Sequence, residues 1–193
     1  LLTSQDNGAF GADTGTSLEN LLMELSHLDG KFRLRVGMLN PMLVAGRSHE
    51  MAKAWGDPRT YKFMHLPIQS GSQKILDSMV RDHTLEEFWE VVNVFREYYP
   101  EMMIITDVIT GFPGETDEDH QETISLLEEL LPDLVNVTRF SPRKGTPASR
   151  YKRINGRIIK KRSRELTVLR KELGARSFKR FVGRKTSILT VEN

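Results

Sequence analysis

The residues whose types could carry chemistry lie between Ile104 and Pro113, in I-I-T-D-V-I-T-G-F-P, which continues as G-E-T-D-E-D. A β-branched run of strand length leads into a loop where Gly111, Pro113 and Gly114 exclude strand and helix. In α/β folds, ligands bind at the carboxyl ends of parallel strands, beside positive helix ends. The loop is therefore a candidate ligand site. The alternative is a plain strand-to-helix turn with a capped helix behind it.

Two carboxylates accompany this loop. Asp107 lies among apolar residues of the expected strand, so its side chain needs a polar partner. Glu115 stands at the exit of the loop, just before Thr116, which can cap the next helix with Asp119 three residues on. Both carboxylates are candidates for ligand contact.

The rest of the chain alternates strand and helix patterns, which predicts right-handed βαβ units and a parallel sheet. Caps are expected at Ser17, Ser48, Ser72 and Thr84. The expected strands cover residues 1–3, 32–38, 61–66, 104–109, 134–137 and 187–191, and the expected helices cover 18–28, 49–55, 73–79, 85–99, 117–131 and 158–181. The polar strand ends at 4–7, 39–41, 67–71, 110–115 and 139–146 should then share one rim.

Composition limits the class of protein. The 193 residues include 38% hydrophobic and 28% charged residues, with no apolar run near the ~20 residues of a membrane helix and no leader pattern, so a cytoplasmic location is expected. The absence of cysteine excludes disulfides, a thiol nucleophile and any thiolate-held zinc or iron–sulfur site built from this sequence alone. No dinucleotide-binding or Walker loop occurs.

Charge is divided unevenly along the chain. Residues 1–149 contain 13 Lys and Arg against 23 Asp and Glu, whereas residues 150–193 contain 15 against 3. A basic segment on an acidic body indicates a polyanionic partner, and nucleic acid is the commonest one. The alternative is a solvated amphipathic helix that happens to be basic.

Three segments together carry a family resemblance: H-L-P-I-Q-S-G-S at His65–Ser72, T-D-V-I-T-G-F-P-G-E-T at Thr106–Thr116, and R-K-G-T-P-A at Arg143–Ala148. In sequence and spacing they resemble the radical S-adenosylmethionine (SAM) methylthiotransferases. L-R-V-G-M-L-N-P at Leu34–Pro41 is more similar to the archaeal and eukaryotic branch, which acts on threonylcarbamoyladenosine in tRNA, than to the isopentenyladenosine branch. The resemblance extends from Leu1 to about Phe181.

The resemblance implies an α/β fold: a partial (βα)6 TIM-like barrel of the radical SAM type, truncated here at its N-terminus. It implies SAM and [4Fe-4S] clusters as cofactors, and addition of a methylthio group to C2 of the adenosine at tRNA position 37. The family's C-x-x-x-C-x-x-C motif and a domain with a second cluster precede the position where this sequence starts. We therefore expect the 193 residues alone to be inactive, with neither cofactor bound and with no metal ligand of their own.

Carried over position by position, the resemblance gives four groups of site residues. The first lies near the methionine moiety, the second at the ribose and carboxylate, the third beside the adenine, and the fourth after the sixth strand of the family's barrel. These cofactor-binding residues are Ser4, Gln5 and Asp6; Gln69, Ser70 and Gly71; Asp107, Ile109, Gly111, Phe112 and Glu115; and Ser141 and Arg143. No catalytic residue is indicated. Each residue alone is also compatible with loop polarity or helix capping, and His65 with a hydrogen-bonded core histidine.

The resemblance also divides the chain, into the partial barrel with its basic helix (1–182) and the opening of a C-terminal RNA-binding β domain (183–193). The basic segment is then the expected contact for the tRNA anticodon stem-loop, and the exposed barrel edge is a candidate dimer contact. The electron and sulfur donors are not indicated. Two alternatives stay open: a non-catalytic RNA-binding module, and a methylthiotransferase acting on isopentenyladenosine tRNA or on a ribosomal protein, although the charge division favours RNA over protein.

Overall fold

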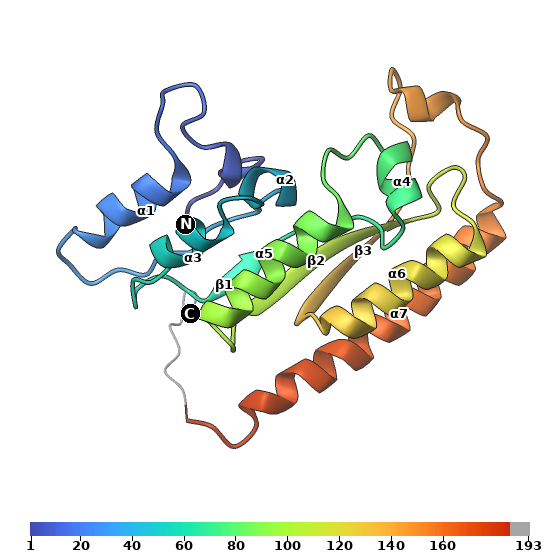
Figure 1. The fold of residues 1–193 in the computed structure, drawn as a ribbon. Helices are drawn as coiled ribbons and strands as arrows, with labels where there is room; N and C mark the ends of the chain where they lie inside the picture. Colours follow the sequence, from blue (N-terminus) through green and yellow to red (C-terminus); the bar gives the residue numbers. More distant parts are fainter. Residues whose placement is uncertain (186–193) are drawn as a thin grey trace, which may run out of the picture.

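The fold is organised around a parallel sheet. The computed structural model describes residues 1–185 (Figure 1). Strands β1 (Phe63–His65), β2 (Met103–Thr110) and β3 (Leu134–Arg139) are all parallel and lie in the order β1-β2-β3. The strand predicted just before Gly111 is therefore the middle strand of this sheet.

Two expected strands, 1–3 and 32–38, do not form continuous ladders, and that part of the prediction is wrong. Instead, single parallel bridges extend the sheet: Leu2 to Val36, Leu34 to Thr60, and Met38 to His65. The reason lies in the hydrogen bonds of residues 34–39, because the amides of Leu34, Gly37 and Leu39 donate to three different neighbours: Arg59, Leu2 and His65. No single neighbour is followed far enough to make a regular strand.

The helices follow the predicted alternation with some changes of boundary. They are α1 (Leu18–Ser26), α2 (Pro41–Val44), α3 (Ser48–Ala54), α4 (Gln73–Ser78), α5 (Leu85–Tyr98), α6 (Asp117–Leu130) and α7 (Gly156–Phe178), with short 3-10 turns η1 (Asn7–Ala9), η2 (Pro147–Arg150) and η3 (Lys179–Phe181). Helix α2 was not expected, because Asn40-Pro41 suggests a break. Pro41 instead begins the helix, where it needs no amide partner, and the Asn40 side chain accepts from the Met42 amide.

Helix caps were predicted well where they are local. Thr84 and Thr116 cap their helices as predicted, each in a capping box with the residue three positions on, and Ser17 accepts from the Asn20 amide. Two caps differ. Ser48 is the first residue of α3 rather than its cap, and Ser72 occupies the cap position of α4 without making the cap hydrogen bond.

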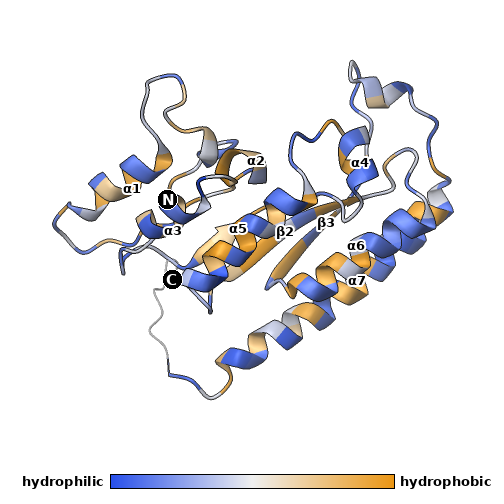
Figure 2. Ribbon diagram, in the orientation of Figure 1, coloured by the Kyte–Doolittle hydropathy of each residue, from blue (hydrophilic) through white to orange (hydrophobic). Residues whose placement is uncertain are grey.

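The two faces of β2 differ in burial. Ile104, Thr106, Val108 and Thr110 are buried, whereas the alternate residues from Met103 to Ile109 are partly exposed. Figure 2 shows β2 as strongly hydrophobic, while α6 and α7 carry much hydrophilic surface. The sheet thus has one helix-covered face and one more open face.

The hydrophobic core lies between the sheet and the helices. Trp55 and Phe95 are fully buried in it and meet edge to face, with ring centroids 5.4 Å apart. No helix among residues 1–185 is long and apolar enough to cross a membrane. The strand expected at 187–191 lies outside the described residues.

Candidate functional site

The segments that follow the three strands gather at one end of the sheet, at the upper right of Figure 1. Two cavities lie along this rim. A cavity of about 420 Å³ is lined by Ser4, Gln5, Asp6 and Gln69, and a cavity of about 620 Å³ is lined by Ile109, Phe112, Ser141 and Arg143. Arg81 lines both cavities, so they adjoin. Eight of the predicted cofactor residues therefore border one continuous region.

Asp6 shapes the smaller cavity by joining two segments. Its Oδ1 atom accepts from the Gly8 amide at 2.9 Å and from the Asn40 amide at 3.3 Å. These bonds hold the turn after residue 3 against the turn after residue 39. The carboxylate is thus part of the cavity wall and braces it.

Gln69 lines the smaller cavity, and its backbone is hydrogen-bonded to Ile109, which lines the larger one. Its φ is 71°, in the left-handed region, which costs a non-glycine residue free energy. The Gln69 amide donates to the Asp107 carbonyl and its carbonyl accepts from the Ile109 amide, both at 2.8 Å. These two bonds to β2 hold the strained residue in place at the rim.

The Asp107 carboxylate has polar partners, as its position among apolar strand residues requires. Its carboxylate lies 3.0 Å from His65 Nε2 and accepts from the Asn136 amide nitrogen at 2.7 Å. Burial acts to raise the pKa of Asp107, but the hydrogen bonds from His65 and Asn136 outweigh it and lower the pKa. The three strands therefore each contribute one member of a polar cluster on the open face, and His65 is half-buried there.

Ser70 and Gly71 line neither of the two cavities. They lie beneath the rim and pack against other parts of the fold. Ser70 is 1% exposed, and the Gly71 amide donates to Thr123 Oγ1 of α6 at 2.9 Å. A Cβ on Gly71 would lie 2.5 Å from the Thr123 Cα and 2.6 Å from the Glu122 carbonyl oxygen, so only glycine fits. Their role as direct ligand contacts stays a prediction, and the structure gives them a packing role.

Glu115 is likewise buried, with a side chain 2% exposed. Its Oε2 atom accepts from the Gly111 amide at 2.9 Å and from Arg162 Nη1 at 2.7 Å. Burial acts to lower the pKa of Arg162, but the hydrogen bonds to Asp117 and Glu115 raise it, so the guanidinium stays charged. Glu115 closes the loop that begins at Gly111.

Sequence reasoning missed several residues of the rim. Arg81 and His83 lie in the connection from α4 to α5 and line the smaller cavity, and Phe140 and Tyr151 line the larger one. His83 is 2% exposed, burial lowers its pKa, and its Nε2 atom lies 3.3 Å from the Ile68 carbonyl oxygen. A usable signal was the pair of basic residues, Arg81 and His83, in a helix-to-helix connection soon after Q-S-G-S.

Comparison with known proteins identifies the family. Residues 9–127 match the family model described as the radical SAM superfamily. The chain belongs to the radical SAM superfamily. Curated relatives agree: a probable threonylcarbamoyladenosine tRNA methylthiotransferase of Archaeoglobus fulgidus is 46% identical over 99% of this chain, and the Xenopus laevis protein named threonylcarbamoyladenosine tRNA methylthiotransferase is 40% identical over 99%. The chain spans 45% and 34% of these two relatives.

Solved structures support the same radical SAM fold. Coproporphyrinogen III oxidase (HemN) of Escherichia coli superposes with a TM-score of 0.61 at 17% identity, covering 81% of this chain and 36% of that one. The archaeal Elp3 of Methanocaldococcus infernus gives 0.54 at 15% identity, covering 86% and 45%. The predicted resemblance and the partial, unclosed α/β fold are thereby confirmed.

The residues present fit one family cofactor and not the other. No cysteine occurs in the sequence, and residues 1–185 contain no group of three or more acidic, His or Cys side chains placed to hold a metal ion. These residues therefore do not ligate an iron–sulfur cluster. SAM fits better, since the smaller cavity offers polar groups for an amino acid and a ribose, and the larger offers aromatic Phe112 and Tyr151 for an adenine.

Proposed function

We propose that this chain is the barrel part of a radical SAM methylthiotransferase that modifies threonylcarbamoyladenosine at tRNA position 37. The observation that carries the proposal is the 46% identity over 99% of the chain to the Archaeoglobus fulgidus relative, supported by the two adjoining cavities at the rim. The cluster-binding cysteines and the rest of the enzyme would be contributed outside these 193 residues, which would be inactive alone.

In this proposal SAM lies across the two cavities. Ser4, Gln5 and Asp6 face its methionine end, Gln69 its ribose, and the wall from Ile109 to Arg143 its adenine. When bound, the cluster and SAM supply the one-electron chemistry that activates the C2–H bond of the target adenine. The protein residues bind and orient the reactants and keep water away from them.

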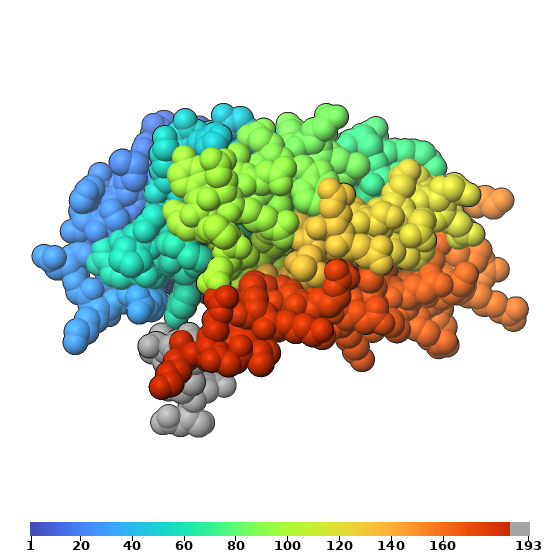
Figure 3. All heavy atoms as spheres, turned by 60° about the horizontal axis from the view of Figure 1, so that its bottom comes forward, coloured from blue at the N-terminus to red at the C-terminus, as the bar shows by residue number. Residues whose placement is uncertain are grey.

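The proposed RNA contact is the outer side of the C-terminal basic segment. Figure 3 shows α7 exposed along the length of one side of the molecule. The exposed basic residues on this helix and the turn after it are Arg157, Lys160, Lys161, Arg164, Lys171, Arg176 and Lys179. Their positive charge suits the phosphate backbone of tRNA. The proposed cellular location is the cytoplasm. The division at residue 183 into barrel and RNA-binding domain is part of the same proposal.

The test uses the full-length protein, reconstituted with iron and sulfide under reducing conditions. We expect cleavage of SAM to 5′-deoxyadenosine and methionine, and a methylthio group on tRNA that carries threonylcarbamoyladenosine, detected by mass spectrometry of nucleosides. tRNA with isopentenyladenosine serves as the comparison substrate. Intact SAM after incubation, together with tight tRNA binding, would support a non-catalytic RNA-binding module instead.

A further inference from the structure

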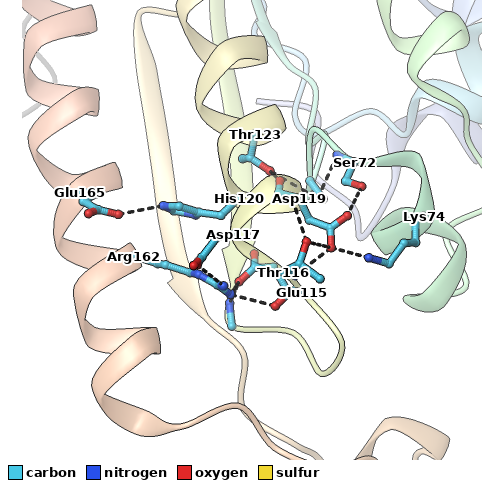
Figure 4. Close-up of polar contacts among 12 residues, drawn as sticks. Ser72, Lys74, Glu115, Thr116, Asp117, Asp119, His120, Thr123, Arg162 and Glu165 are labelled. Atoms are coloured by element: carbon cyan, nitrogen blue, oxygen red, sulfur yellow. Dashed lines mark hydrogen bonds and ion pairs between the residues drawn. The ribbon is translucent and has the colours of Figure 1, made fainter.

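Helix α7 reaches the rim through its inner side (Figure 4). Arg162, which is 4% exposed, donates from Nη1 to Glu115 Oε2 at 2.7 Å and to the Glu115 carbonyl oxygen at 3.0 Å. Its Nη2 atom donates to Asp117 Oδ1 at 2.7 Å. Because Glu115 Oε2 also accepts from the Gly111 amide, one guanidinium fixes both ends of the five-residue loop 111–115.

The same helix touches the loop one turn earlier. Gly111 has a φ of +80°, and a Cβ placed there would lie 2.7 Å from Cγ1 of Ile159. Ile159 and Arg162 are three residues apart, so they lie on one side of α7. The helix thus contacts the loop twice, by packing at its start and by an ion pair at its end.

Residues other than Arg162 also hold α7 on the body. Leu166 and Leu173 on the same helix are buried in the core, and Arg180, just after the helix, pairs with Asp133 at 2.6 Å. What Arg162 contributes beyond this is a set of bonds to the loop itself. A buried ion pair costs desolvation free energy, so its place beneath this loop indicates a role in shaping the loop.

We propose that Arg162 is a positioning residue, which holds the loop 111–115 in the conformation that receives SAM. The inference rests on the proposed function, because it takes this loop as a wall of the SAM site. Loss of the guanidinium would release the Glu115 side chain from the Gly111 amide and let the loop move. SAM binding should then weaken even where the protein stays folded.

The experiment compares variants of the full-length protein. Equilibrium dialysis gives the Kd for SAM, and hydrogen–deuterium exchange gives the protection of the Gly111 amide. Arg162→Gln should raise the Kd about ten-fold and speed exchange at Gly111. Arg162→Lys keeps the charge but not the forked geometry, so we expect partial rescue of both. The matched control is Arg180→Gln, which breaks the ion pair from the same segment to Asp133 and should leave the Kd unchanged.

Several results would overturn the inference. One is an unchanged Kd for SAM in Arg162→Gln, and another is an equal rise of the Kd in Arg162→Gln and Arg180→Gln, which would mean a general loss of stability. Failure of the proposed function looks different, since the unaltered protein would then neither bind nor cleave SAM.

Discussion

Gly71→Ala tests whether this glycine serves packing. The added Cβ would lie 2.5 Å from the Thr123 Cα and 2.6 Å from the Glu122 carbonyl oxygen, both backbone atoms of α6 that no rotamer change can move. Overpacking of this kind costs ~1–3 kcal/mol, and weakening the hydrogen bond from the Gly71 amide to Thr123 adds ~1 kcal/mol. We therefore expect a loss of about 2–4 kcal/mol in the free energy of unfolding.

The assay is urea unfolding followed by tryptophan fluorescence, since Trp55 is fully buried in the core. Gly156→Ala is the control, because a Cβ there meets nothing within 4 Å and alanine is at least as good a helix former. It should leave the free energy of unfolding equal or slightly higher. An unchanged stability in Gly71→Ala, with SAM binding lost, would refute the packing argument and return Gly71 to direct ligand contact.

Two further predictions concern charge. Burial acts to raise the pKa of Asp119, but hydrogen bonds from Lys74, Thr116 and Ser72 hold it well below its usual range. The charged carboxylate therefore stabilises the fold at neutral pH, and this stabilisation is lost as the pH falls below ~4. Asp119→Asn should therefore cost ~1.5–3 kcal/mol at pH 7 and progressively less in acid, measured by urea unfolding; an equal cost at every pH would contradict this. For RNA, tRNA affinity should fall steeply with salt and Lys160→Gln should reduce the log–log slope by about one, while a flat salt response would remove the RNA role of α7.

Features that depend on near neighbours in sequence were predictable. Thr84 and Thr116 are followed three residues later by the carboxylates that complete their capping boxes, and both boxes form. The β-branched run before Gly111 became the middle strand, because β-branched residues favour strands, and every second residue of it is buried. The position of the rim follows from the same alternation of strands and helices.

Features that depend on distant partners were not predictable. Ser72 has a good capping residue type, yet its hydroxyl donates to Asp119, 47 residues away, at 2.7 Å. The sequence predicts that the Glu115 carboxylate contacts a ligand, yet this carboxylate is buried in an ion pair with Arg162. In both cases the competing partner comes from another element, and nothing in the local pattern shows how closely that element approaches.

The charge division of the sequence has a different meaning once the contacts are known. Some charges of the basic segment already form ion pairs with the acidic body: Arg162 pairs with Glu115 and Asp117, and Arg180 pairs with Asp133. Arg162 is buried and Arg180 is only partly exposed, so these two arginines serve contacts within the molecule. The case for a polyanionic partner therefore depends on the outward basic residues of α7, whose only acidic neighbours on the helix are Glu165 and Glu172. A single helix would then bind RNA on its outer side and shape the SAM loop on its inner side.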